Sequence, residues 1–123
     1  MTTFRKYFLL TSITLIVIIF VLLALFFLNQ DFQELIISLT VEEETVYAKG
    51  YSLKSFKQVR INDSADKVIH LLGEPLAKDK VRDDHVVFYY SEQGPKDTNY
   101  RERKIVFNRE GKVKKIIREF YID

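Results

Sequence analysis

The sequence contains no cysteine and only two histidines, His70 and His85. Without cysteine, the chain cannot form disulfides, thiolate zinc sites or cysteine nucleophiles, and no lipid can be attached through a cysteine side chain. This absence does not identify the compartment, because a disulfide-free domain is compatible with the cytosol and with an extracytoplasmic space. The compartment has to be inferred from other features.

Patterns typical of catalytic sites are also missing. The sequence has no glycine-rich phosphate-binding loop and no pair of carboxylates in an apolar setting. Asp66 and His70 are spaced to bind a metal weakly on one helix, but a solvated pair is the simpler interpretation. His85, beside Asp83 and Asp84, is interpreted as the polar lead-in to a strand. We therefore predict no enzyme activity, no metal and no cofactor.

Length and charge limit the organisation of the chain. Its 123 residues allow one domain, and the core of such a small domain stabilises a fold only marginally. We expect a cytoplasmic N-terminus and transmembrane helix over residues 1–28, a juxtamembrane stalk or connector over 29–50, and one domain over 51–123. The net charge of +2 is accounted for by Arg5 and Lys6, so charge does not favour nucleic-acid binding.

The apolar run from Phe8 to Leu28 is about 21 residues long, enough to cross a hydrocarbon core of ~30 Å. A cleavable signal peptide would have a shorter run followed by small residues, whereas this run ends in bulky ones, so we expect an uncleaved anchor. Arg5 and Lys6 precede the run, and the first basic residue after it is Lys49. The positive-inside rule therefore predicts a single-pass protein with its N-terminus in the cytoplasm and its C-terminal domain outside.

The connector over 29–50 begins with an apolar stripe at helical spacing, made of Phe32, Leu35, Ile36 and Leu39. A helix of this kind fits the membrane surface or packing on its own domain. It also fits a stalk or a partner-binding helix, for which Phe32 is the candidate contact. The remainder fits either a short helix ending near Gly50 or an extended connector.

Start and stop signals predict two helices in the domain. Ser52 caps a short helix over 52–59, and Asp63 or Ser64 caps a second helix over 65–72. Asn62, which enters the left-handed region at little cost, precedes the second helix.

The second helix has a clear end. Leu72 is its last apolar residue, Gly73 supplies a left-handed C-terminal cap, and Pro75 prevents continuation. These signals fix the helix more firmly than its short length would.

Strands follow the second helix. Residues 85–90 alternate, 104–107 pair back, and 108–111 form a hairpin turn in which Gly111 takes the positive φ position. The segment 113–120 fits a helix or a strand, and a strand is favoured because a tight turn follows an alternating run. The expected fold class is α+β, with an N-terminal transmembrane helix and then two helices packed on a three-stranded antiparallel β-meander.

Three stretches carry a family resemblance: Phe56-x-x-Val59-x-Ile61-Asn62-Asp63-Ser64 continuing to Leu72-Gly73-Glu74-Pro75, then Phe88-Tyr89-Tyr90, then Val106-Phe107-Asn108-Arg109-Glu110-Gly111. In this order they resemble the SmpA/OmlA (BamE-like) family over residues 52–118. The resemblance implies two helices on a three-stranded sheet, similar to β-lactamase inhibitor protein repeats. It also implies a non-enzymatic scaffold that contacts partner proteins and, in some members, lipid. Family members typically carry a lipoprotein signal with a cysteine, which a transmembrane helix replaces here, and Asn62 stands where a glycine is usual.

Two groups of residues are candidate contacts. The candidate partner-binding residues in the domain are Tyr89, Tyr100 and Tyr121, because aromatics that cannot all face one small core tend to lie on binding surfaces. The alternative is that these strand aromatics are simply core. The candidate contacts for lipid or an acidic partner are Arg101, Arg103, Lys112, Lys114 and Arg118. Solvated strand faces explain this basic group equally well.

With this resemblance we expect a non-enzymatic envelope module, anchored in the inner (cytoplasmic) membrane with a periplasmic C-terminal domain. It is expected to bind envelope proteins and to assist outer-membrane or envelope protein assembly. One alternative is an inhibitor or immunity-type protein that binds a single envelope enzyme. Another is a structural element that contacts anionic lipid. No nucleic-acid partner is expected.

Overall fold

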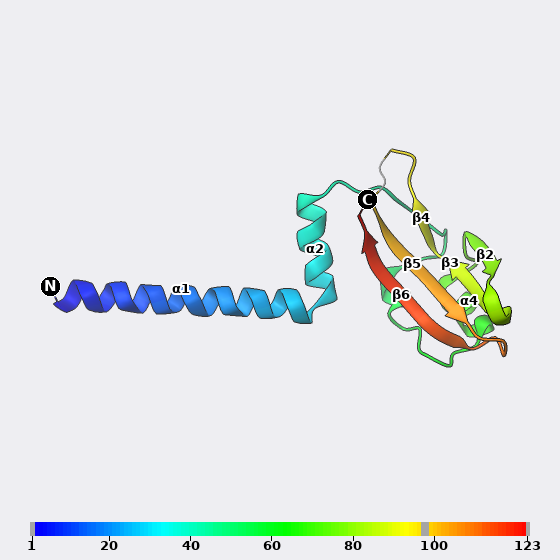
Figure 1. Cartoon of the computed structure of the whole chain (residues 1–123), viewed down its shortest axis with the longest axis horizontal. Coiled ribbons are helices and arrows are strands. Elements are labelled where there is room, and N and C mark those ends of the chain that lie inside the picture. The colour runs from blue at the N-terminus through cyan, green and yellow to red at the C-terminus, as the bar shows by residue number, and fades with distance from the viewer. Residues whose placement is uncertain (1, 97–98, 123) are drawn as a thin grey trace. The chain divides into compact units, whose positions relative to one another are not determined.

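The computed structural model describes residues 2–96 and 99–122. The chain divides into two compact units, an N-terminal unit (Met1–Val41) and a C-terminal domain (Glu42–Asp123), seen in Figure 1. In chain order the helices and strands are α1 (Thr2–Leu28), α2 (Gln30–Thr40), β1 (Thr45–Tyr47), α3 (Leu53–Phe56), α4 (Ala65–Leu72), β2 (Ala77–Lys80), the 3₁₀ turn η1 (Arg82–Asp84), β3 (Val86–Tyr89), β4 (Ser91–Gln93), β5 (Tyr100–Phe107) and β6 (Val113–Tyr121).

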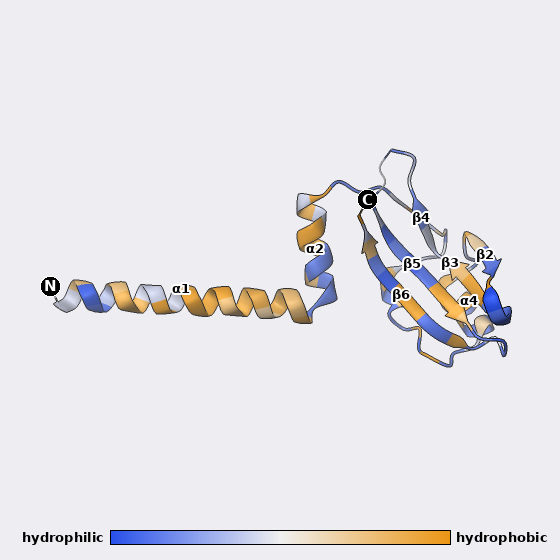
Figure 2. Ribbon diagram, in the orientation of Figure 1, coloured by the Kyte–Doolittle hydropathy of each residue, from blue (hydrophilic) through white to orange (hydrophobic). Residues whose placement is uncertain are grey.

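The first helix, α1, is long and apolar enough to cross a membrane. Figure 2 shows it as a nearly continuous hydrophobic ribbon beyond its first turns. Its hydroxyl groups are satisfied within the helix, since Thr11, Ser12 and Thr14 each donate to a carbonyl oxygen three or four residues earlier. The expected apolar helix is confirmed, and its orientation in a membrane stays a prediction.

The second helix, α2, is separated from α1 by a single residue, Asn29. The backbone of Asn29 is extended, and its side-chain oxygen accepts hydrogen bonds from the N–H groups of Asp31 and Phe32 at 3.0 and 3.2 Å. These bonds satisfy donors that a helix start leaves open. The helix therefore restarts at Asn29, and Figure 1 shows α2 turning away from the axis of α1.

In the C-terminal domain, a four-stranded antiparallel sheet has the order β2-β3-β5-β6, and β1 pairs with β4 in a separate two-stranded sheet. The α+β class is confirmed, as is the strand nature of the last segment. The predicted three-stranded meander is correct for β3, β5 and β6 but wrong in the number of strands. An edge strand, β2, and the β1–β4 pair complete the sheets.

Strand β2 escaped prediction because it carries none of the usual strand signals. Residues 77–80 read Ala-Lys-Asp-Lys and are exposed throughout. The turn that joins β2 to β3 has no glycine. Asp83 and Asp84 instead adopt φ values of 61° and 60°, the positive values that two-residue hairpin turns require. Aspartate tolerates this region better than most residues, so Asp-Asp closes a hairpin that Asn-Gly usually marks.

Strand β4 continues from β3 through an irregularity at Tyr90 and Ser91. The Tyr90 N–H donates to the Arg103 carbonyl at 2.8 Å. The Ser91 hydroxyl accepts from the Arg103 N–H at 2.7 Å and donates to the Arg101 carbonyl at 2.6 Å. A side-chain hydroxyl thus takes the place of a backbone partner, and the other side of β4 is left for β1, with Thr45 opposite Gln93.

The core lies between the helices and one face of the sheet, called here the inner face. Its buried members are Ala48, Phe56, Val59, Val68, Leu72, Phe88, Tyr90, Ile105, Phe107 and Val113. The rings of Phe88 and Phe107 lie with centroids 4.5 Å apart. Burial of apolar area at this face is the main stabilising term for a domain of this size.

The helix boundaries follow the predicted capping residues. The hydroxyls of Ser52 and Ser64 accept from the N–H groups of Ser55 and Lys67, both at 3.1 Å. Asn62 has φ 74°, Gly73 has φ 74° with ψ −169°, and Gly111 has φ 72°, so all three predicted positive-φ positions are confirmed. Helix α3, the first of the two helices predicted in the domain, is shorter than expected and ends at Phe56.

The end of α4 is in close contact with two distant segments, which the sequence did not reveal. A Cβ on Gly50 would lie 2.7 Å from the Leu72 carbonyl oxygen, so the chain after β1 approaches the end of α4 too closely for a side chain. The Tyr90 hydroxyl donates to the Gly73 carbonyl at 2.9 Å. The end of α4 is therefore held by two other segments of the domain.

Candidate functional site

The face of the four-stranded sheet opposite the core, called here the outer face, is the candidate functional site. The strand register places Tyr89, Lys104 and Ile117 side by side across β3, β5 and β6. Because side chains alternate along a strand, the same face carries Val87, Tyr100, Glu102, Val106, Lys115, Glu119 and Tyr121. None of these side chains belongs to the core cluster, although Val87 is buried by its neighbours on this face.

The three predicted tyrosines come together on the outer face. The rings of Tyr100 and Tyr121 pack with centroids 5.4 Å apart, and the Lys104 Nζ lies 5.8 Å from the centre of the Tyr89 ring. Tyr121 is 46% exposed, while Tyr89 and Tyr100 are partly buried by their neighbours. These three tyrosines are not core residues, because each lies outside the core cluster.

Two of the charged side chains on this face, Lys104 and Glu102, form an ion pair. The Lys104 ammonium contacts the Glu102 carboxylate at 2.5 Å. Burial opposes the charged form of Lys104, but the hydrogen bond and charge of Glu102 outweigh it and raise the pKa of Lys104. Burial also raises the pKa of Tyr100, and the nearby Glu102 adds to this effect. The outer face therefore presents tyrosine rings beside the Lys104–Glu102 ion pair.

Such a face suits recognition of a protein. Tyrosine supplies a large, rigid contact area together with a hydroxyl group, and aromatic residues are enriched at interface centres. The aliphatic side chains of Val106 and Ile117, both partly buried, extend this surface on β5 and β6. Phe32, the fourth predicted contact, lies on α2 in the N-terminal unit and is not part of this face.

The five predicted basic contacts do not form one surface. Arg103 is only 1% exposed, and its guanidinium donates to the Tyr51 hydroxyl at 3.1 Å and to the Glu102 carbonyl at 2.9 Å. Because Arg103 is buried, its prediction as a lipid or partner contact is wrong. Arg101 lies near it and forms an ion pair with Glu43 at 2.7 Å.

The remaining basic candidates lie along β6. Lys112 and Lys114 are exposed near the start of the strand, where the Lys114 Nζ lies 3.3 Å from the His85 Nε2. Arg118 is partly buried and stands opposite Arg103 in the register. Electrostatic attraction to a single anionic surface would need these cations together, and the fold separates them.

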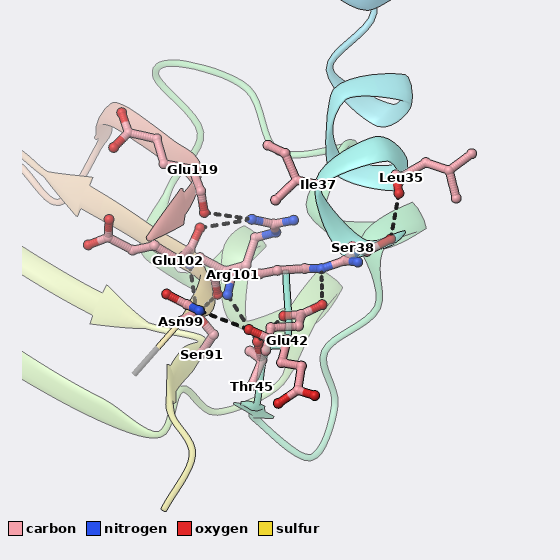
Figure 3. A network of polar contacts seen from close by, with 12 residues as sticks. Leu35, Ile37, Ser38, Glu42, Thr45, Ser91, Asn99, Arg101, Glu102 and Glu119 are labelled. Carbon is pink, nitrogen blue, oxygen red and sulfur yellow. Dashed lines mark hydrogen bonds and ion pairs between the residues drawn. The ribbon is translucent and has the colours of Figure 1, made fainter. Parts of the chain in front are cut away.

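The acidic residues at the start of the C-terminal domain have a structural function that sequence reasoning missed. Figure 3 shows how Glu42, Thr45, Asn99 and Arg101 meet. Asn99 Nδ2 donates to the Glu42 carbonyl, and the Arg101 N–H donates to the Thr45 hydroxyl, both at 2.9 Å. The Thr45 hydroxyl in turn donates to Glu43 at 2.7 Å. The acidic run therefore ties β1 to the start of β5.

The histidines do not gather into a reactive site. His70 and Asp66 are exposed on α4, and His85 precedes β3 as predicted, with its Nδ1 3.0 Å from the Arg82 carbonyl. Within residues 2–96 and 99–122, no group of three or more histidine, cysteine or acidic side chains is arranged to hold a metal ion. The chemistry available on the outer face is contact and hydrogen bonding.

Comparison with known families supplies an independent line of evidence. Residues 52–117 match the family described as the outer membrane protein assembly factor BamE domain. No curated protein matches the chain. The match covers more than half of the 123 residues, from the cap of α3 into β6, and includes every buried core residue except Ala48 and most of the outer face. The chain therefore belongs to the BamE domain (SmpA/OmlA) family.

Proposed function

We propose that this protein is a non-enzymatic module of the cell envelope, tethered to the inner membrane by α1, that binds a partner protein through its outer face. The observation that carries the proposal is the cluster of Tyr89, Tyr100 and Tyr121 on a sheet face left out of the core. Membership of a family of assembly factors supports binding rather than catalysis.

The proposed location follows from the charges around α1. Arg5 and Lys6 precede the apolar run, and no basic residue follows it before Lys49. This asymmetry favours a cytoplasmic N-terminus and an extracytoplasmic domain. A periplasmic position places the outer face where outer-membrane and envelope proteins pass during assembly, and assistance to that assembly is the proposed role.

The location has a direct test that uses the lack of native cysteine. A single cysteine at Lys67, an exposed position on α4, should react in intact spheroplasts with a maleimide that does not cross membranes. A cysteine at Arg5 should react only after lysis. Labelling at Arg5 before lysis and at Lys67 only after lysis would contradict the proposed orientation.

The binding surface has a separate test by photo-crosslinking in cells. A benzophenone amino acid at Tyr89 or Tyr100 should form adducts with envelope proteins because both positions lie on the outer face. The same group at Lys67, on the helical side of the domain, should form few. Adducts from Lys67 without adducts from the two tyrosines would contradict the proposal.

The identity of the captured protein separates two kinds of function. Capture of envelope assembly proteins supports the assembly role. A single envelope enzyme captured alone, with loss of its activity on binding, would instead indicate an inhibitor that uses the same face. Mass spectrometry of the adducts decides between them.

A further inference from the structure

The N-terminal unit contains a helix whose apolar side is turned outward. On α2, Phe32, Leu35, Ile36 and Leu39 form the apolar stripe, and Leu35 and Leu39 are 53% and 74% exposed. Glu34 lies on the other side of the helix and is buried. A helix in water does the reverse, burying its apolar stripe and exposing its acids. Within the N-terminal unit, Leu35 and Leu39 are therefore left as an apolar surface without an apolar cover.

The neighbouring helix indicates which environment covers this surface. α1 is apolar enough to span a membrane, and it ends only one residue before α2 begins. Its last two side chains, Phe27 and Leu28, are themselves 71% and 86% exposed. Asn29, the polar residue that follows, stands where the apolar run ends. In a spanning helix this is the level of the lipid headgroups.

The geometry at Asn29 then sets the course of α2. The extended backbone and the side-chain cap at Asn29 end one helix and start another, and α2 turns away from the axis of α1, as Figure 1 shows. A helix that leaves a membrane-spanning helix at headgroup level and changes direction runs along the bilayer surface. The amphipathic pattern of α2 is the pattern of helices that lie in this interface.

We propose that α2 lies flat in the surface of the bilayer that α1 spans, at the C-terminal end of α1, with its apolar stripe inserted among the acyl chains. Charge excludes an electrostatic attachment, since α2 carries Asp31 and Glu34 and no lysine or arginine. The apolar stripe therefore contacts the hydrocarbon boundary of the bilayer rather than an anionic headgroup. The short link at Asn29 keeps α2 beside the membrane, so a weak intrinsic affinity suffices.

The lack of native cysteine makes the proposal directly testable on the full chain. Single cysteines at Leu35 and Leu39, labelled with an environment-sensitive fluorophore, report from the stripe. A cysteine at Gln33, on the polar side, is the matched control. The protein is reconstituted in vesicles of phosphatidylcholine alone, and quenching by spin-labelled lipid is compared with quenching by aqueous iodide.

The proposal predicts blue-shifted emission at positions 35 and 39, quenching by the spin-labelled lipid and protection from iodide. A label at position 33 should show no quenching by the spin-labelled lipid. A charge introduced into the stripe, Leu39→Glu, should expose the label at 35 to iodide, whereas Thr40→Glu outside the stripe should not.

Three results would overturn the proposal. Labels at 35 and 39 that iodide quenches freely would place the stripe in water. Protection from both quenchers would show that protein, either the same chain or a second copy, covers it. Lipid quenching that appears only after phosphatidylglycerol is added would show that headgroup charge, and not apolar insertion, holds the helix.

Discussion

The two faces of the β3-β5-β6 sheet are built from alternating residues of the same strands, yet they have opposite surroundings. Phe88, Ile105 and Phe107 point to the inner face and are almost fully buried against the helices. Their sequence neighbours Tyr89 and Val106 point to the outer face and lie outside the core. In each strand, one residue therefore contributes to the stability of the core and its neighbour to the surface available for recognition. Substitutions of neighbouring residues should therefore separate the two properties.

The largest expected effect comes from Ile105 and Val106, which are neighbours on β5. Ile105→Ala should lower the free energy of unfolding by about 2–5 kcal/mol, because it leaves a cavity in a fully buried site. Val106→Ala on the outer face should cost less than about 1 kcal/mol, since its surroundings are partly solvent. Urea denaturation of the C-terminal domain, followed by circular dichroism, measures both. Equal losses would mean that the outer face is packed as tightly as the core.

A smaller effect is expected at the adjacent tyrosines. Tyr90→Phe removes the hydroxyl that bonds to the Gly73 carbonyl and should cost about 1–2 kcal/mol, because the buried acceptor loses its partner. Tyr89→Phe removes an outer-face hydroxyl and should change stability by only a few tenths of a kcal/mol. The same urea titrations compare them. A cost at Tyr89 as large as at Tyr90 would contradict the assignment of faces.

The stability of the domain should also depend on pH through Tyr90. Burial raises the pKa of the Tyr90 hydroxyl well above its usual range, with a smaller contribution from Glu74. A raised pKa in the folded state means that the unfolded chain ionises first, so the stabilisation holds below about pH 10 and is lost as pH rises beyond it. Wild-type stability should fall steeply above pH 10, and Tyr90→Phe should reduce that slope. An unchanged slope would show that Tyr90 does not control alkaline unfolding.

The smallest effect is expected at the edge strand, which belongs to neither buried face. Asp84→Gly should stabilise the domain by about 0.5–1 kcal/mol, because glycine adopts the φ of 60° at this turn without the strain that a side chain carries. The Asp84–Lys80 ion pair that is lost is largely exposed and worth little. As a control, Asp79→Gly within β2 should be destabilising. A loss of stability from Asp84→Gly would contradict the hairpin geometry.

The sequence specified the parts of the fold that rest on local signals. Ser52, Ser64 and Gly73 marked helix ends through capping chemistry that acts within a few residues, and alternation along β3 and β5 marked strands with two distinct faces. Alternation does not say which face the helices cover. That choice was left open for Tyr89 and Tyr100 until the register was known.

The features missed from the sequence depend on contacts between distant residues. β2 is polar on both faces and is recruited as an edge by its hairpin with β3. The residues Glu42 and Glu43 bond to Asn99 and Arg101, more than fifty residues away, and no local pattern indicates these contacts. Arg103 was expected at the surface because arginine is charged, but its position in β5 directs its side chain to the inner face, where it is buried.

The division between the two faces is tested most directly by measuring the crosslink yield from a benzophenone group at Tyr100 in two backgrounds. One background carries Tyr89→Ala, which removes outer-face contact area, and the other carries Tyr90→Phe, which weakens the core. The account predicts that Tyr89→Ala abolishes the adduct while the domain stays folded, and that Tyr90→Phe keeps the adduct despite lower stability. An adduct that survives Tyr89→Ala and disappears with Tyr90→Phe would contradict it.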